Sequence, residues 1–336
     1  MSPEQPIPQG LSQTRREFLR RSAQAGAAIA AAGSLSAWLL DRHPPGDFSR
    51  MRSLDARRDF SMRSPGPSMG IATGRDRPAM LRGALAALGG IERFIKRGDR
   101  VMVKVNAAFA TPAMIGATTN PELLSELVRL CRAAGAASVV VTDNPINAPE
   151  SCFELTGIGP AARASGADLY VPGPGSFRSG TLKGASLIRD WPVLDEPFFG
   201  VTKLIGVAPV KSHHRAGASM TMKNWYGLLG GRRNQFHQDI DGIIVELSMM
   251  VRPTLVVLDG TDSMMANGPT GGSLADLKET NTLIVSTDGV AADALGATLL
   301  GRTYRDLPYL VRAGALGLGT TDYESLRPVR VAPANA

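Results

Sequence analysis

Cysteine is almost absent from the 336-residue sequence, which contains only Cys131 and Cys152. Two thiols cannot complete a four-cysteine zinc or iron–sulfur site within one chain, so no intrinsic iron–sulfur cluster is expected. The two residues could form a disulfide if the protein is exported, or they could remain buried free thiols. The sequence leaves the cofactor unknown, with a divalent metal held by other side chains as one option.

Several common signatures of catalysis and of nucleic-acid binding are also missing. No glycine-rich segment ends in the G-K-[ST] of a P-loop, and no G-x-G-x-x-G follows a predicted strand, so nothing indicates a nucleotide cofactor. The H-E-x-x-H zinc motif does not occur. The net charge of +7 comes from basic residues scattered between acidic ones, without a Lys/Arg run interleaved with aromatics. We therefore expect no nucleic-acid partner.

The N-terminal sequence indicates export. The segment SQTRREFL places Arg15 and Arg16 before Phe18 and Leu19, and a weakly apolar stretch rich in Ala, Gly and Ser follows. This order is typical of a twin-arginine signal, which implies the twin-arginine translocation machinery as a partner. A single membrane span is the alternative, but the Gly, Ser and Gln content makes the stretch poorly hydrophobic. The expected location is the periplasm, or the membrane if the signal remains uncleaved as an anchor.

The chain divides into three segments by composition. Residues 1–40 are assigned to the twin-arginine signal segment. Residues 41–76 are rich in Arg, Pro, Ser and Gly without apolar periodicity, and we expect a linker or extended arm. Residues 77–331 are predicted to form a single α/β domain.

Helical and strand-like patterns alternate within this domain. Short continuous apolar strands separated by helices predict an α/β fold with a mostly parallel sheet and helices on both faces. The expected strands are 101–105, 137–142, 169–171, 203–207, 254–258 and 283–286. The expected helices are 78–95, 120–133, 220–229, 236–250, 290–300 and 304–313.

Polar residues stand at or just after the carboxyl ends of several predicted strands. Ligands bind at this edge of an open α/β sheet, so we expect these side chains to line one crevice. For any one of them, a helix cap or a turn is the alternative interpretation. The residues are Lys104, Asn106, Asp143, Lys211, His213, Asp259 and Asp288.

Spaced motifs along residues 77–331 resemble a known family. The motifs are Lys104-x-Asn106, Thr119-Asn120-Pro121, Lys211-x-His213, Thr221-x-Lys223-Asn224-x-x-Gly227, His237, Asp259-Gly260 followed by Asn267-Gly268-Pro269, and Asp288 to Asp293. In this order they are similar to the domain-of-unknown-function family 362. The resemblance implies little about function. Many relatives carry a ferredoxin-type cysteine run and are labelled iron–sulfur proteins, and this chain lacks that run.

A cluster of basic and amide side chains occupies residues 210–231. Lys211 lies at a predicted strand end, and Lys223 and Asn224 lie in the first turns of the helix that follows. Cationic side chains beside a helix N-terminus suit an anion, because the free backbone N–H groups and the helix dipole add to their charge. A carboxylate or a phosphate fits this site. The alternative is a solvated Lys223 and an Asn224 on a polar helix face.

Three histidines, His213, His214 and His237, fall in the same region. An enzyme would use His213 or His237 as general acid or base, because imidazole titrates near physiological pH, and Lys211 or Lys223 would hold the charge of the substrate. The alternative is a metal site formed by His213, His237 and Asp259.

Three functions follow from these residues. The first is an exported enzyme that acts on a small anionic molecule at the carboxyl edge of the sheet. The alternatives are a non-catalytic ligand-binding or assembly protein, and a metal-dependent or redox-partner protein. The expected ligand-binding residues are Lys104, Asn106, Asn120, Asp143, Lys223, Asn224, Asp259, Asn267, Gly268 and Asp288. The glycine-rich loop that holds Asn267 and Gly268 would give close backbone approach to a ligand, or form a plain surface turn.

If the N-terminal segment is a twin-arginine signal, its function depends on the paired arginines. Replacing Arg15 and Arg16 with lysine should leave the protein in the cytoplasm, as measured by cell fractionation. Unchanged export of this double variant would contradict the assignment.

Overall fold

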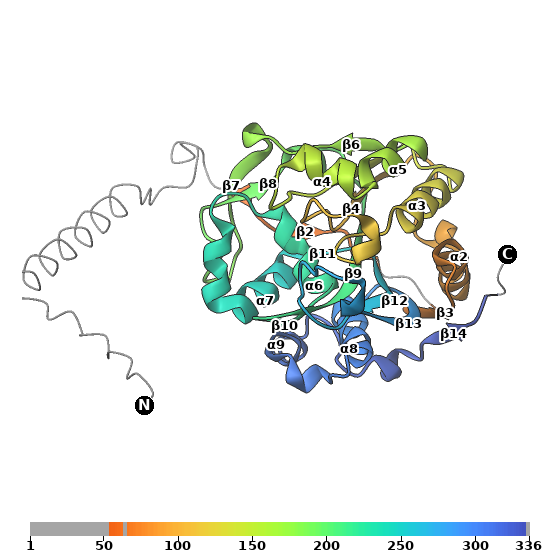
Figure 1. Ribbon diagram of the computed structural model, residues 1–336. Coiled ribbons are helices and arrows are strands. Elements are labelled where there is room, and N and C mark those ends of the chain that lie inside the picture. Colours follow the sequence, from red (N-terminus) through yellow and green to blue (C-terminus); the bar gives the residue numbers. More distant parts are fainter. Residues whose placement is uncertain (1–53, 63–65, 334–336) are drawn as a thin grey trace, which may run out of the picture. The chain divides into compact units, whose positions relative to one another are not determined.

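Short β-branched runs form the centre of the fold. A computed structural model describes residues 54–62 and 66–333, and its largest sheet has nine strands in the order β14-β3-β13-β12-β9-β4-β5-β6, with β10 paired to β9 (Figure 1). These strands are β3 (Met69–Thr73), β4 (Arg100–Lys104), β5 (Ser138–Thr142), β6 (Asp168–Tyr170), β9 (Lys203–His213), β10 (Gly217–Ser219), β12 (Leu255–Met264), β13 (Leu277–Ser286) and β14 (Val329–Val331). The predicted signal segment, residues 1–40, lies outside the described residues.

Strand direction confirms the predicted fold class. From β12 to β6, each strand runs parallel to its neighbour, and β14 is parallel to β3. Strand β13 alone along this order is antiparallel to both of its neighbours, β3 and β12. The protein is therefore an α/β fold with a mostly parallel sheet.

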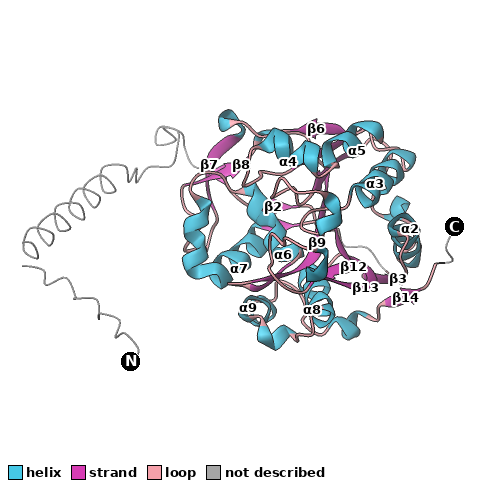
Figure 2. Ribbon diagram, in the orientation of Figure 1, coloured by secondary structure: helices cyan, strands magenta, loops and turns pink. Residues whose placement is uncertain are grey.

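Helices cover both faces of the sheet, as Figure 2 shows. One apolar core packs the odd-numbered side chains of β4, such as Val101 and Val103, against the first group of helices. A second core packs Met102 and Leu204 against the other group. The first group is α2 (Arg77–Ala87), α3 (Pro121–Ala133), α4 (Pro149–Leu155) and α5 (Ile158–Ala164). The second group is α6 (Thr221–Asn224), α7 (Ile240–Met250), α8 (Gly289–Leu299) and α9 (Pro308–Ala315).

Several predicted elements have different bounds in the structure. The helix expected over 78–95 ends at Ala87, because Gly89 and Gly90 adopt positive φ angles of 94° and 85°. The helix expected over 220–229 is a single α-helical turn followed by a 3₁₀ segment, Trp225–Leu228. The helix expected over 236–250 begins only at Ile240. Strands β9, β12 and β13 extend well beyond their apolar runs into polar residues.

The expected linker over residues 41–76 is wrong where the structure describes it. Strand β3 lies inside the main sheet between β13 and β14. Two further small sheets use β1 (Leu54–Asp55) with β7 (Phe177–Thr181) and β8 (Trp191–Leu194), and β2 (Arg58–Asp59) with β11 (Val251–Arg252). The folded domain therefore begins before residue 77. Strand β3 was not predicted because its sequence, MGIAT, is short and contains only one β-branched apolar residue.

Two further features concern the sulfur chemistry and the membrane. Cys131 and Cys152 are both free and buried. None of the helices in residues 54–62 and 66–333 combines the length and the hydropathy that a membrane span requires.

Close packing of β3 against α2 gives a test of this boundary. A Cβ atom on Gly70 would lie 2.3 Å from the carbonyl oxygen of Ala84. Gly70→Ala should therefore lower the free energy of unfolding by about 1–3 kcal/mol, measured by chemical denaturation. The control is Gly272→Ala, where an added Cβ would meet no atom within 4 Å. Equal stability of the two variants would contradict the close packing of β3 against α2.

Candidate functional site

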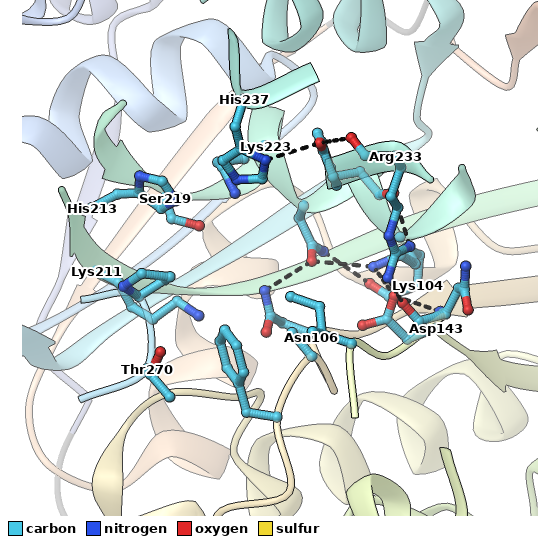
Figure 3. Close-up of a pocket in the computed structure, with 18 of the residues that line it drawn as sticks. Lys104, Asn106, Asp143, Lys211, His213, Ser219, Lys223, Arg233, His237 and Thr270 are labelled. Atoms are coloured by element: carbon cyan, nitrogen blue, oxygen red, sulfur yellow. Dashed lines mark hydrogen bonds and ion pairs between the residues drawn. The ribbon is translucent and has the colours of Figure 1, made fainter. Parts of the chain in front are cut away.

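A pocket of about 270 Å³ opens at the edge of the sheet where β4 and β5 end and β9 turns back through β10 (Figure 3). The structure brings together many of the predicted site residues here. Those that line the pocket are Lys104, Asn106, Asp143, Lys211, His213, Lys223, Asn224 and His237.

A buried ion pair closes the floor of the pocket. The Nζ atom of Lys104 lies 2.7 Å from Oδ1 of Asp143, and both side chains are almost fully buried. Lys104 also donates to the carbonyl oxygen of Val105 at 2.6 Å. Burial lowers the pKa of Lys104, and the Asp143 carboxylate partly offsets that effect. Because Lys104 is already paired, its main role is to hold the strand ends together rather than to bind a ligand.

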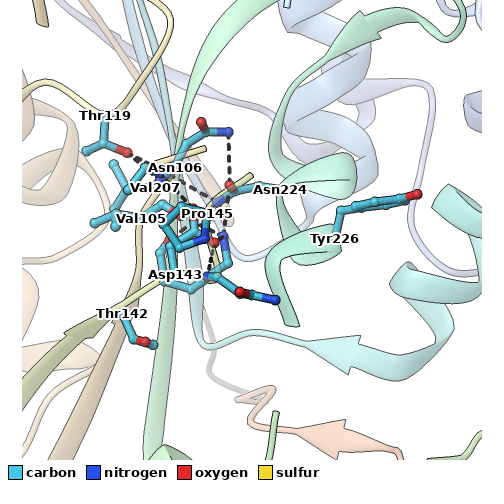
Figure 4. A network of polar contacts seen from close by, with 12 residues as sticks. Val105, Asn106, Thr119, Thr142, Asp143, Pro145, Val207, Asn224 and Tyr226 are labelled. Atoms are coloured by element: carbon cyan, nitrogen blue, oxygen red, sulfur yellow. Dashed lines mark hydrogen bonds and ion pairs between the residues drawn. The ribbon is translucent and has the colours of Figure 1, made fainter. Parts of the chain in front are cut away.

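Asn224 connects this ion pair to the neighbouring strand and helix (Figure 4). Its Oδ1 accepts hydrogen bonds from Lys104 Nζ at 3.2 Å and from Asn106 Nδ2 at 3.3 Å. Its Nδ2 donates to the carbonyl oxygens of Lys104 at 3.3 Å and Val207 at 3.1 Å. The Oδ1 atom of Asn106 is buried and has no hydrogen-bond partner among the residues that the structure describes. The pocket therefore holds one unsatisfied acceptor, which could accept a hydrogen bond from a ligand.

Lys211 and Lys223 lack the carboxylate partner that Lys104 has. Lys211 is only 1 % exposed, and its Nζ donates to the carbonyl oxygen of Ala117 at 2.5 Å. Lys223 is half-buried, with Nζ 5.1 Å from the centre of the Tyr226 ring. Neither lysine forms an ion pair with a carboxylate in the part of the chain that the structure describes.

Burial and neighbouring positive charges lower the pKa of both lysines. Burial lowers the pKa of Lys211 to about 7, and the charge of Lys223 contributes. Burial likewise lowers the pKa of Lys223 to about 8, together with the charge of Arg233. An anion placed between them would restore both charges, because an opposite charge favours the protonated form.

Hydrogen bonds to the backbone set different proton positions on two histidines. His213 Nδ1 accepts from the backbone N–H groups of Arg215 and Ala216, both at 3.1 Å, so its proton belongs on Nε2. His237 Nδ1 lies 3.1 Å from the carbonyl oxygen of Asn234, which can only accept, so its proton belongs on Nδ1. The Nε2 atom of His213 is thus a donor, and the Nε2 atom of His237 is an acceptor.

Both rings are kept neutral. Burial, with the charge of Lys223, lowers the pKa of His213 to about 2. The same two causes lower the pKa of His237. The two rings stack with their centres 6.0 Å apart. Two neutral imidazoles of opposite hydrogen-bonding polarity therefore stand side by side at the pocket.

Arg233 and Tyr226 also line the pocket, although nothing in the sequence predicted a role for them. Arg233 donates to the carbonyl oxygens of Asn144 at 2.6 Å and Leu229 at 2.9 Å. The Tyr226 hydroxyl donates to the carbonyl oxygen of Arg233 and lies 3.3 Å from His237 Nδ1. The pair of arginines in GGRRN offered no signal that separates Arg233 from its neighbour Arg232.

A buried carboxylate outside the pocket positions helix α6. Asp293 accepts from the backbone N–H groups of Thr221 at 2.8 Å and Met222 at 3.0 Å, which begin the helix. Burial raises the pKa of Asp293 to about 7, although these hydrogen bonds favour its ionised form. Asp293 belongs to the motif used for the family resemblance, but the sequence alone assigned it no role. It holds the short helix that carries Lys223 and Asn224.

Two predicted site residues lie elsewhere. Asp259 Oδ2 pairs with Arg77 Nε at 2.8 Å, and its Oδ1 accepts from Thr261 Oγ1 at 2.7 Å, so it faces helix α2. Asp288 caps helix α8 by accepting from Ala291 N at 3.0 Å. It sits at the opposite edge of the sheet, because β13, which precedes it, is antiparallel. The expectation of one shared crevice is wrong for these two residues.

The remaining predicted binding residues have structural contacts. Asn120 caps helix α3 and accepts from Glu122 N at 2.9 Å. Asn267 donates to Asp276 Oδ1 at 2.6 Å. Gly268 passes so close to Ser212 that a Cβ atom would lie 2.0 Å from its carbonyl oxygen. This close approach brings Pro269 and Thr270, rather than Asn267 or Gly268, into the pocket.

The three metal ligands proposed from the sequence do not come together, since Asp259 is held by Arg77. Within the described ranges, no group of three or more His, Cys, Asp or Glu side chains is arranged to hold a metal ion.

Comparison with known proteins places these residues in context. A family described as Domain of unknown function (DUF362) matches residues 101–298. The thylakoid-associated protein sll1697 of Synechocystis sp. is 26 % identical over 259 residues, which cover 75 % of this chain and 78 % of that protein.

Two solved structures show weaker similarity. The lactate racemase apoprotein of Thermoanaerobacterium thermosaccharolyticum is 11 % identical, with a TM-score of 0.38, over 66 % of this chain and 54 % of that one. A Thermotoga maritima protein is 12 % identical, with a TM-score of 0.32, over 55 % and 51 %. The chain thus spans about half the length of these structures, and their names carry no argument about its function.

The unpaired ammonium group of Lys211 should cost stability in the absence of a ligand. Its pKa falls from an ordinary value near 10.5 to about 7 on folding, so between these values the unfolded chain binds more protons. Lys211→Met should therefore raise the free energy of unfolding at pH 7 by on the order of 1–3 kcal/mol, measured by denaturation without anions. The gain should shrink as the pH rises from 7 to 10.5.

The matched control is Lys104→Met, which removes one partner of the buried ion pair. It should destabilise the protein by about 3–5 kcal/mol, because Asp143 would keep an uncompensated buried charge. A Lys211→Met variant less stable than the parent would contradict the assignment of an unpaired charge.

Proposed function

The chain belongs to the domain-of-unknown-function family DUF362, and we propose that this member is an exported enzyme that binds a small anion in the pocket between β4, β9 and α6. The anion is a carboxylate or a phosphate. Lys211 and Lys223 carry this proposal, because both ammonium groups face one pocket and neither forms an ion pair with a carboxylate within residues 54–62 and 66–333.

The charge of the pocket supports an anion more generally. Its lining contains four side chains of Lys or Arg and a single carboxylate, that of Asp143, which Lys104 already neutralises. A bound anion would interact in a partly dehydrated site, where charge-assisted hydrogen bonds are stronger than at the surface. The side-chain amides of Asn106 and Asn224 would hold fixed positions beside the anion. Asn224 is hydrogen-bonded to two strands, and Asn106 donates to Asn224.

The two histidines favour an enzyme over a passive binding protein. A neutral imidazole with a free Nε2 lone pair, as in His237, can accept a proton from a bound substrate. The adjacent Nε2–H of His213 can donate a hydrogen bond to an oxygen on which negative charge develops. Lys211 and Lys223 would hold the anionic group during this transfer. We infer a proton-transfer step, with His237 as base and His213 as hydrogen-bond donor.

Export rests on the sequence. The paired residues Arg15 and Arg16, with the weakly apolar segment that follows, support passage through the twin-arginine machinery. This route carries proteins that have already folded. A preformed pocket held by a buried ion pair is compatible with it.

Charge removal tests the anion site. Lys211→Met and Lys223→Met should each weaken binding at least about tenfold, because a lost charge-assisted hydrogen bond in a desolvated site costs on the order of 1.5–3 kcal/mol. Arg215→Met is the control: Arg215 is exposed, lies outside the pocket lining, and donates to the carbonyl oxygen of His237 at 2.8 Å. Its loss should change affinity little.

The measurement is calorimetric titration of the full chain with a panel of carboxylates and phosphates. Equal losses in all three variants would indicate a diffuse electrostatic surface instead of a pocket. Failure of the parent protein to bind any member of the panel would rule out the anion site.

A further inference from the structure

One part of the pocket lining, the apolar wall, consists of apolar residues. They come from two loops that follow β4 and β5, and from the loop between β12 and β13. These residues are Ala108, Phe109, Ile146 and Pro269. We propose, on the basis of the anion site proposed above, that the ligand is an anion on an apolar body, such as an aryl or alkyl carboxylate or phosphate.

Phe109 connects the apolar part of the pocket lining to its cationic side chains. The centre of its ring lies 5.4 Å from Nζ of Lys211, within the range of a cation–π contact. An anionic group that reaches Lys211 would therefore lie beside the Phe109 ring. The ring offers a face for stacking with an aromatic group or for packing with an alkyl group.

Ile146 is exposed although it is large and apolar. It remains 64 % exposed at the mouth of the pocket, just beyond β5, whose last residue is Thr142. An apolar ligand body would cover it and remove this surface from water. Isolated exposed apolar residues are common, but Ile146 lines the same cavity as Phe109 and Pro269.

The acceptors of the pocket argue against a sugar or another polyhydroxylated body. Asp143 already accepts from Lys104 Nζ, Ala107 N and Asn144 N. Asn224 Oδ1 accepts twice within the network. Asn106 Oδ1, which has no partner among the described residues, could receive one ligand hydroxyl, but a polyhydroxylated body carries several, and burying the others without acceptors costs free energy. The volume of the cavity, about 270 Å³, lies just below the range for drug-sized ligands and therefore fits a small aryl or alkyl anion.

Matched ligand pairs test this inference by calorimetry on the full chain. Phenylacetate should bind at least about tenfold more tightly than acetate, and phenyl phosphate at least about tenfold more tightly than inorganic phosphate; tenfold corresponds to ~1.4 kcal/mol. Glucose 6-phosphate should bind no more tightly than inorganic phosphate. Equal affinities within each pair would overturn the apolar body while leaving the anion site intact. Absence of binding by every ligand would overturn both proposals.

A variant locates the effect. In Ile146→Ser, the ratio of phenylacetate to acetate affinity should fall at least about threefold, because a polar side chain would replace the exposed apolar one. Leu316→Ser is the control, because Leu316 is 61 % exposed and lies outside the pocket lining. It should keep the ratio of the parent protein. An unchanged ratio in Ile146→Ser, or equal falls in both variants, would contradict the assigned apolar wall.

Discussion

The buried contact between Lys104 and Asp143 determines how the edge of the sheet is organised. It joins the end of β4 to the residue after β5, and Asn224 extends it to β9 and α6. The 3₁₀ segment that follows α6 packs so closely that a Cβ atom on Gly227 would lie 1.9 Å from Asp143 Oδ1. A buried ion pair contributes little net stability but is costly to break. Its effect here is geometric, because it fixes where α6 presents Lys223 and where the following 3₁₀ segment presents Tyr226.

Much of the sheet and part of the site could be predicted from sequence. Continuous apolar runs indicate parallel strands, and polar residues at their ends meet at one edge, as Lys104, Asp143 and Lys211 do. Strand direction is not readable from these runs, since a short apolar strand has the same pattern in either direction. Asp288 was misplaced for this reason, because β13 is antiparallel. Asp259 was misplaced because β12 continues to Met264, so this residue lies inside the strand, where its carboxylate pairs with Arg77.

The rest depends on contacts between distant parts of the chain. Arg233 donates hydrogen bonds to the carbonyl oxygens of Asn144, Pro145 and Leu229, and only the folded chain brings these groups together. The proton positions on His213 and His237 depend on which backbone groups lie beside each Nδ1 atom. The sequence can indicate that histidines and lysines gather in one region. Their protonation, pairing and burial follow from the tertiary structure.

Strand β13, which is antiparallel to both of its neighbours, also affects the pocket itself. Because it runs back along β12, the segment 265–276 that joins them starts and ends at the same edge of the sheet. A parallel successor would have required a crossover to the opposite edge before its strand could begin. The reversal leaves a hairpin loop anchored at both ends, which places Pro269 and Thr270 beside the pocket. A ligand that contacts this loop would therefore restrain the ends of two adjacent strands, β12 and β13, which lie inside the sheet.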